Sequence, residues 1–501
     1  MGDGVTVIGG AAAERAASVG RRAVASFVWA ATSFAVSRGL QLLTTLVLTR
    51  ILSPSEFGVV GVGLAIVAFS EVALDLGISA ALIYEQARGI NKRVRMAFTL
   101  NLLITALCTA IAVSGAPAVA ASTGTDGEAP LLRAIFLYLL LRGAGQVHDA
   151  VLRRDMRFGR RAFVELARAG CRAAVSIGLA LQGAGAWAMV LGLLAGEVLG
   201  TGILWTLVHI RPAVRLDASV TRTLLRYGGA ALGIRVVAEF AQNVDYFVVG
   251  HRLGPAALGT YLIAFRLPEL LLSNVYWIFS SIAFPAYSAA RETDPGAFRP
   301  VVLRALTLLT IYGLPVGTGL AVVAHDATTV LFSSRWSGSA TPMCLIALSM
   351  AVISVGYASG DVLPAVGRPG SLLKITIALT VLAVAGYVVA APHGVTAVAL
   401  AHLGWSLIVA GVRLHIANRM IRASMIDSLR ALIPGVVIAG GAAAGALPVV
   451  LATTPGAAAL LAEVAAGAAG GFAALLLVRP QAVHDVQHAV LAGMRNRGPV
   501  V

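Results

Sequence analysis

The sequence has little charge and almost no lysine. Only 12% of its 501 residues are Asp, Glu, Lys or Arg, about half the share of roughly 25% that is typical of soluble domains. Hydrophobic residues make up 58% of the chain, and the mean hydropathy is +0.86. This composition excludes an ordinary water-soluble protein and predicts a lipid bilayer as the solvent. Because Lys92 and Lys374 are the only lysines, any cationic site must be built from arginine.

Cysteine and catalytic motifs are scarce as well. Cys108, Cys171 and Cys344 are isolated within apolar stretches, so they give no metal-ligand spacing and no disulfide framework, and we expect buried structural thiols. No Walker motif or nucleotide-binding loop is present, and no loop is long enough for a catalytic domain. The net charge of +15 comes from short basic clusters between apolar runs, a pattern that argues against nucleic-acid binding. We therefore expect no enzyme activity, no metal and no bound cofactor.

The apolar runs predict an all-α polytopic membrane protein of about fourteen transmembrane helices. Crossing a hydrocarbon core of about 30 Å takes roughly 20 apolar residues. The first run continues to Leu48, which is too long for a signal peptide despite the arginines before it. The predicted spans lie near 24–48, 58–82, 96–121, 131–152, 160–182, 186–209, 224–250, 258–287, 301–324, 340–363, 372–391, 394–417, 430–452 and 456–478.

The basic residues also predict an orientation. If the N-terminus is cytoplasmic, the segments between spans that then face the cytoplasm carry 28 arginines and lysines, against 4 on the opposite side. By the positive-inside rule, cytoplasmic loops of membrane proteins are enriched in arginine and lysine. Missing or inventing one helix in mid-chain would abolish the asymmetry, so the count predicts fourteen spans with both termini inside.

A repeated turn predicts two similar halves. Leu52–Gly58 follows the first span and Leu253–Gly259 follows the seventh, and both read Leu-small-Pro-x-x-apolar-Gly. Proline ends a helix and glycine permits a chain reversal. We therefore predict two parallel six-helix lobes, with two extra helices outside the repeat. The predicted boundaries are a tail at 1–23, lobes at 24–210 and 222–420, extra helices at 428–478 and a tail at 479–501.

Six arginines fall well inside predicted spans, apart from those counted with the loops at the span ends, and each costs about 2.5–3.5 kcal/mol at a helix centre. Arginine stays charged and offers a fork of donors that matches phosphate oxygens. Four of the six lie deep enough to line a polar cavity and are candidates for binding an anionic substrate; these are Arg38, Arg142, Arg235 and Arg266. Arg168 and Arg172 share a span with Glu165 and lie nearer its cytoplasmic end, so they are either structural or functional.

Carboxylates occur at the same depths. Glu71 and Asp75 share one helix face that could meet Arg38, and Glu239 and Glu269 lie three or four residues from Arg235 and Arg266. These pairs either neutralise one another or release the arginines when a phosphate enters. A released carboxylate would couple transport to an H⁺ or Na⁺ gradient, and the candidates for this role are Glu71, Asp75 and Asp245.

Several stretches resemble the polysaccharide transporter (Wzx-like) flippases of the multidrug/oligosaccharidyl-lipid/polysaccharide superfamily. Residues 50–58 (RILSPSEFG) and 69–83 (FSEVALDLGISAALI) are similar to that family's N-terminal signature. Residues 245–254 (DYFVVGHRLG), 259–270 (GTYLIAFRLPEL) and 284–287 (FPAY) are similar to its seventh and eighth helices. The resemblance covers roughly residues 24–420, and Arg142 lies outside the matching stretches.

The resemblance implies a protein of the bacterial inner membrane, with two lobes around a cationic cavity that opens alternately to each side. It also implies that the substrate is an undecaprenyl-diphosphate-linked oligosaccharide destined for the cell surface or an exopolysaccharide, with polysaccharide polymerases or glycosyltransferases as further partners. The alternatives are a peptidoglycan-precursor flippase, a drug/cation antiporter with a carboxylate-dominated site, and a membrane glycosyltransferase or polymerase.

Overall fold

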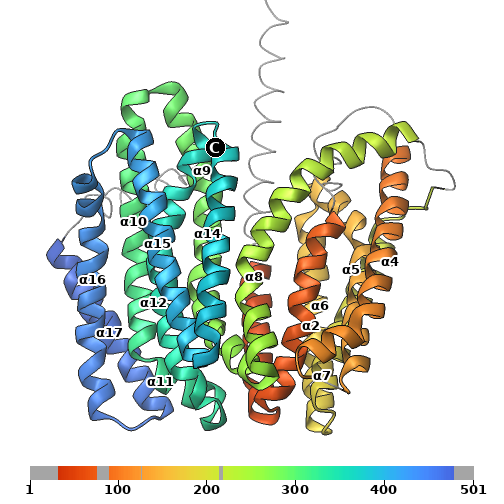
Figure 1. The fold of residues 1–501 in the computed structure, drawn as a ribbon, viewed down its shortest axis with the longest axis horizontal. Helices are drawn as coiled ribbons and strands as arrows, with labels where there is room; N and C mark the ends of the chain where they lie inside the picture. Colours follow the sequence, from red (N-terminus) through yellow and green to blue (C-terminus); the bar gives the residue numbers. More distant parts are fainter. Residues whose placement is uncertain (1–31, 76–89, 126, 214–217, 479–501) are drawn as a thin grey trace, which may run out of the picture. The chain divides into compact units, whose positions relative to one another are not determined.

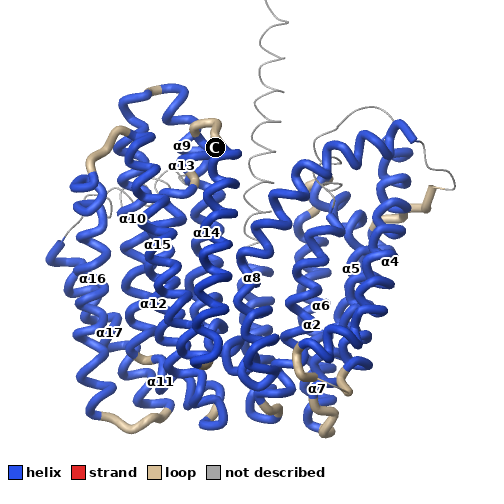
Figure 2. Tube along the Cα trace, viewed as in Figure 1, coloured by secondary structure: helices blue, strands red, loops and turns tan. Residues whose placement is uncertain are grey.

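The computed structural model describes residues 32–75, 90–125, 127–213 and 218–478. Helix is the only regular secondary structure in these ranges (Figure 2). The chain divides into two compact units. Unit 1 consists of Met1–Leu52 and Val59–Phe240, and unit 2 consists of Ser53–Gly58 and Ala241–Val501.

In unit 1 the main helix packing runs from α4 through α5 and α7 to α6. An apolar cluster around Phe98 and Val147 lies between α4 and α5. The elements are a helix at 32–51, α2 (Pro54–Asp75), α4 (Ile90–Ser122), α5 (Ala129–Arg154), α6 (Phe158–Leu181), α7 (Ala186–Leu207) and the first part of α8 (Ala218–Pro268).

Unit 2 holds the remaining elements, and α16 packs against both α10 and α17 (Figure 1). The two extra helices of the sequence prediction are therefore part of this unit. Its apolar core includes Tyr276, Leu309 and Val355. The elements after α8 are η1 (Glu269–Ser273), α9 (Asn274–Thr293), α10 (Pro295–Val322), α11 (Ala324–Ala327), η2 (Thr328–Phe332), η3 (Ser334–Ser339), α12 (Ala340–Gly360), α13 (Val362–Ala365), α14 (Pro369–Ala390), η4 (Ala391–His393), α15 (Val395–Ile421), α16 (Met425–Ala452) and α17 (Ala457–Val478).

Every predicted span overlaps a described helix. Within the described ranges, eleven helical stretches are long and apolar enough to cross a bilayer, and one of them, Glu239–Thr293, joins two predicted spans. The helices at 32–51 and α6 are not among the eleven; both carry arginine within their apolar runs. The all-α, multi-pass fold is confirmed, whereas the orientation with both termini inside stays a prediction. The three cysteines are free but only half-buried.

The two units divide within α8, after Phe240, and not in the predicted loop at 210–222. The ring of Phe240 contacts Phe69 of α2 edge-on, with 6.5 Å between the centroids. The first part of α8 therefore packs with unit 1, while its later part packs with unit 2. Within the later part Gly254 has φ 81°, a conformation that glycine adopts without steric cost, and the helix bends there.

The two copies of the repeated turn contact each other within unit 2. A Cβ atom added at Gly58 would overlap the carbonyl oxygen of Pro255, and one added at Gly259 would overlap the carbonyl oxygen of Pro54. Each glycine thus faces the proline of the other copy at a distance that no side chain permits. Small residues allow such close backbone approaches between membrane helices. The repeated glycine is therefore explained by a packing requirement as well as by the turn.

We predict that Gly58→Ala lowers the thermal unfolding temperature of the purified protein. The added methyl group must displace the backbone at Pro255, and overpacking of this kind costs about 1–3 kcal/mol. Gly319→Ala in α10 is the matched control, because a Cβ there meets no atom within 4 Å and alanine favours a helix over glycine by roughly 0.5–1 kcal/mol. Equal unfolding temperatures for the two variants would contradict this explanation of the repeat.

Candidate functional site

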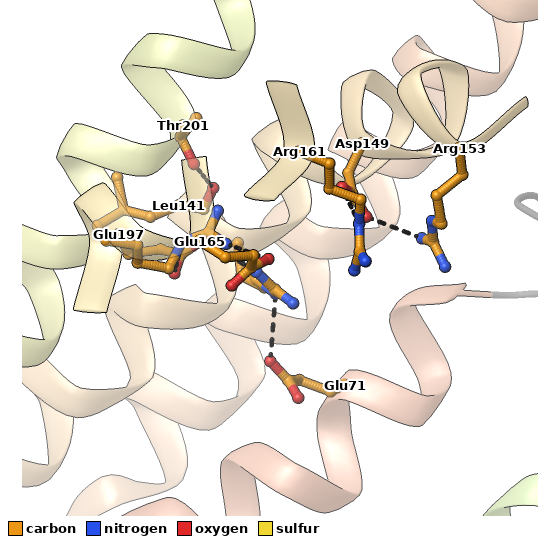
Figure 3. Close-up of polar contacts among 10 residues, drawn as sticks. Glu71, Leu141, Asp149, Arg153, Arg161, Glu165, Glu197 and Thr201 are labelled. Atoms are coloured by element: carbon orange, nitrogen blue, oxygen red, sulfur yellow. Dashed lines mark hydrogen bonds and ion pairs between the residues drawn. The ribbon is translucent and has the colours of Figure 1, made fainter. Parts of the chain in front are cut away.

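Charged side chains from four helices of unit 1 form a continuous network (Figure 3). Along the network acidic and basic groups alternate, from Glu71 of α2 through Arg142 of α5 and Glu197 of α7 to Arg168 and Glu165 of α6. Three of the four helices that carry these residues, α2, α5 and α7, are apolar enough to cross a bilayer, and α6 packs against α7. The network therefore lies among the transmembrane helices and not in a loop.

Glu197 bridges the two arginines. One of its carboxylate oxygens lies 2.9 Å from Nε of Arg168, and the other lies 3.5 Å from Nη1 of Arg142. Arg168 also donates from Nη1 to Oε1 of Glu165 at 2.9 Å. Arg142 reaches Glu71 with Nε, 3.7 Å from Oε1. Arg168 is thus held by two close carboxylates, whereas both carboxylates of Arg142 are farther away.

The sequence of α7 makes room for this arrangement. A Cβ added at Gly200 would lie 2.6 Å from Nε of Arg168, and one added at Gly196 would lie 2.7 Å from its carbonyl oxygen. The two glycines therefore let α6 and the Arg168 guanidinium approach α7 closely. Thr201 of α7 donates a hydrogen bond to the carbonyl oxygen of Leu141 at 3.0 Å, which fixes α7 against α5 next to Arg142 (Figure 3).

Burial separates the roles of the two arginines. The side chains of Glu197 and Arg168 are 2% and 13% exposed, whereas those of Arg142 and Glu71 are 38% and 39% exposed. A buried charge needs a partner of opposite charge, so the ion pair between Glu197 and Arg168 is the internal support of the network. Arg142 keeps an accessible guanidinium beside a loosely held carboxylate. Such an arginine can donate hydrogen bonds to the oxygens of a phosphate in place of Glu71.

Arg38, another candidate of unit 1, has its described contacts outside this network. We predicted that Glu71 faces Arg38, but Glu71 is paired with Arg142. The described contacts of Arg38 are a hydrogen bond to Gln41 at 3.1 Å and a cation–π contact with Phe34 at 5.2 Å. Arg172 lies half-buried in α6, one turn after Arg168. The side chain of Asp75 is outside the described residues.

In unit 2, Asp245 is a buried carboxylate enclosed by aromatic side chains. Its oxygens accept hydrogen bonds from the hydroxyl of Tyr261 and the backbone N–H of Tyr246, both at 3.0 Å. The rings of these two tyrosines pack edge-on. No described basic side chain forms an ion pair with Asp245, which distinguishes it from the carboxylates of the unit 1 network.

The remaining candidates lie along α8 and η1. Glu239 and Arg266 are half-buried in α8, and Glu269 is exposed at the start of η1. Pro268 cannot donate to the helix ladder, and the π-helical turn Glu269–Ser273 follows it directly. The side chain of Arg235 is outside the described residues, so its predicted pairing with Glu239 and its predicted place in a cavity stay predictions.

Sequence reasoning missed Glu197. A signal was available, because Glu197 is the only charged residue in the span Ala186–Leu207, and an ionisable residue within a membrane helix is a functional candidate by default. Arg413, near the end of the predicted span 394–417, was counted with the cytoplasmic basic residues and not among the candidates. In the structure Arg413 is half-buried within α15, close to Asp361 and to the backbone of Gly360.

A second charged group lies around the connection between α5 and α6, residues 153–161, which the predicted orientation places in the cytoplasm. Asp149 accepts from Arg161 at 2.8 Å and lies 3.1 Å from Arg153 (Figure 3). These arginines are each more than a third exposed, and exposed ion pairs contribute at most about 1 kcal/mol. These residues fit a role in orienting the chain across the membrane and in packing the ends of α5 and α6.

Comparison with known proteins gives the chain a family context. The family of polysaccharide biosynthesis proteins matches residues 47–341, which is more than half of the chain. The chain is 26% identical over 326 residues to the succinoglycan biosynthesis transport protein ExoT of Rhizobium meliloti (strain 1021), covering 65% of this chain and 66% of that protein, just under two thirds. It is 22% identical to the lipopolysaccharide biosynthesis protein WzxC of Escherichia coli (strain K12), covering 74% and 76%.

Among solved structures, the chain is similar to the lipid II flippase MurJ in an inward closed conformation. The TM-score is 0.70 at 12% sequence identity, and the alignment covers 90% of this chain and 99% of that one. At this identity the likeness concerns the fold alone.

We predict that Glu197→Ala lowers the free energy of unfolding by about 3–5 kcal/mol, because it leaves two partly buried arginines without their shared carboxylate. Denaturant unfolding of the protein in detergent micelles measures the change. The double variant Arg168→Met/Glu197→Met is expected to recover much of the loss, since no unpaired buried charge remains at that position. Glu165→Gln, at the 33%-exposed end of the network, is the matched control with an effect below about 1 kcal/mol. A loss as small as that control for Glu197→Ala would contradict the bridging role.

Proposed function

Because the chain belongs to the polysaccharide biosynthesis protein family, we propose that it is a flippase for a lipid-linked oligosaccharide. In this proposal it moves an undecaprenyl-diphosphate-linked oligosaccharide from the cytoplasmic to the outer leaflet of the bacterial cytoplasmic membrane, by alternating access. The product serves a cell-surface polysaccharide or an exopolysaccharide. The multi-pass helical fold and the names of the relatives, a succinoglycan transport protein and a lipopolysaccharide biosynthesis protein, support this proposal.

The observation that carries the proposal is the position of Arg142. It is the more exposed guanidinium of a network among membrane helices, and its two carboxylates lie at 3.5 and 3.7 Å. A diphosphate offers several anionic oxygens in the geometry that a guanidinium fork binds. We place Arg142 in direct contact with the diphosphate, while Arg168 holds Glu197 in position beneath it. Arg38, Arg235 and Arg266 remain proposed contacts of the same substrate.

The exchange of partners also suggests a coupling step. When a phosphate oxygen takes the place of Glu71 at Arg142, the Glu71 carboxylate loses its cation in a medium that penalises an unpaired charge. It would then take up a proton or Na⁺, and release it when the substrate leaves and Arg142 returns. Glu71 is the first candidate for this role, and the buried carboxylate Asp245 is the second.

Two other transport functions are the alternatives to this proposal. A peptidoglycan-precursor flippase would also carry a lipid diphosphate, and the likeness to MurJ concerns the fold alone at 12% identity. A drug/cation antiporter needs a carboxylate-dominated site, which the accessible guanidinium of Arg142 does not favour. We further propose that the chain is a transporter without catalytic residues, and that polymerases or glycosyltransferases of the same polysaccharide are its partners.

The experiment that tests the function is leaflet-resolved detection of the lipid-linked oligosaccharide in cells depleted of the protein. We expect the intermediate to accumulate in the cytoplasmic leaflet and to disappear from the outer one. Unchanged appearance in the outer leaflet would overturn the flippase proposal. Accumulation of the peptidoglycan precursor in its place would favour the first alternative.

We predict that Arg142→Met reduces transport by on the order of tenfold or more while the protein level in the membrane stays normal. A hydrogen bond to a charged group contributes about 1.5–3 kcal/mol, and about 1.4 kcal/mol corresponds to tenfold in affinity. Arg142→Lys should retain part of the activity, because it keeps the charge but not the fork. Arg153→Met removes a similarly exposed, paired arginine of the same helix and should transport normally. Equal transport by both methionine variants would remove Arg142 from the substrate path.

A further inference from the structure

A pair of buried carboxyl groups lies in unit 2, away from the charged network of unit 1. Asp326 belongs to the short helix α11 and is 4% exposed, and Glu463 belongs to α17 and is 0% exposed. Figure 1 shows α11 at the same end of unit 2 as the connection between α16 and α17. In the orientation predicted from the basic residues, this is the external end of the helices.

The two carboxyl groups lie within hydrogen-bonding reach of each other. Oδ2 of Asp326 and Oε2 of Glu463 are fully buried, and neither accepts a hydrogen bond from any described donor. The hydroxyl of Thr453 donates to the other oxygen of Glu463 at 3.4 Å. Two ionised carboxylates have no proton to share and repel each other, so a hydrogen bond between them requires that one is protonated.

The surrounding elements offer little charge to neutralise the pair. Glu463 is the only ionisable residue of α17, and those of α16 are Asp427 and Arg430 at its opposite end. The charged residues of α10, Arg299 and Arg304, lie near the start of that helix, more than twenty residues from Asp326. His325 in α11 itself and Arg335 in η3 are both exposed, and α12 contains no charged residue.

We propose that Asp326 and Glu463 form a proton-binding site that holds one shared proton between α11 and α17. The site is independent of Arg142 and of the substrate. It accounts for two buried oxygens that otherwise lack a donor, because one proton satisfies both. Loss of the proton leaves two adjacent negative charges, which repel each other. The shared proton therefore stabilises the contact between α17 and α11.

Infrared difference spectroscopy of the purified full-length protein in sodium-free detergent solution tests the site directly. We compare the wild type with Asp326→Asn and with Glu463→Gln at neutral pH. The wild type should show the C=O stretch of one protonated carboxylic acid that is missing from both variants, because an amide donates to the remaining carboxylate without needing a proton. Glu292→Gln removes an exposed carboxylate of unit 2 and should leave the band unchanged.

Each outcome decides the proposal. A band that both amide variants retain would overturn it. A sodium site would also overturn the proposal. It would show itself by a band that appears only without sodium and by a stabilisation of the wild type by sodium chloride that Asp326→Asn abolishes. If an amide variant fails to fold, Thr453→Val decides. It keeps both carboxyl groups but removes the hydroxyl next to Glu463, so the band should persist and shift, whereas an unchanged band would exclude Glu463 as its source. Loss of transport by Arg142 variants has no bearing on any of these results.

Discussion

The structure of unit 1 depends on the cost of placing arginine among membrane helices. At about 2.5–3.5 kcal/mol for each charge near a helix centre, two arginines on adjacent helices need carboxylates at matching depth. Glu197 meets this need for both Arg142 and Arg168 at once. The small residues of α7, the bond from Thr201 to α5 and the position of Glu165 one turn from Arg168 all follow from that constraint. Of the two arginines, only Arg142 keeps an accessible guanidinium. This guanidinium is the basis of the proposed substrate site.

Much of the fold could be predicted because the bilayer imposes a strong pattern on the sequence. Runs of about 20 apolar residues indicate helices, and each predicted span overlaps a described one. The limits appear where the pattern is weak. The division of the chain within α8 depends on which neighbours each half packs against, as the contact of Phe240 with Phe69 shows, and no local pattern encodes that. The glycines of the repeated turn were recognised, but their reciprocal contact with Pro54 and Pro255 required the three-dimensional arrangement.

The sequence predicted which types of residue form the candidate site, but only part of the ion pairs between them. Depth along a helix identified Arg142 and Glu71 separately, but not that they are partners, because rotation about the helix axis decides which side chains meet. The predicted pairing of Glu71 with Arg38 failed for this reason. Arg168, Glu165 and Arg172 were recognised as an ambiguous group, and the two close contacts of Arg168 favour a supporting role for it. Glu197 was overlooked although a lone carboxylate in an apolar span is a strong signal.

The central claim is that Arg142 exchanges Glu71 for a phosphate of the substrate. Equilibrium binding of a polyprenyl diphosphate to the purified protein in detergent tests this claim most directly, when the wild type is compared with Glu71→Gln. Glu71 competes with the phosphate for the same guanidinium, so removal of its charge should tighten binding several-fold, while Glu197 still holds Arg142 in place. If Glu71→Gln binds the lipid as weakly as the wild type or more weakly, the two do not compete for Arg142 and the account is wrong.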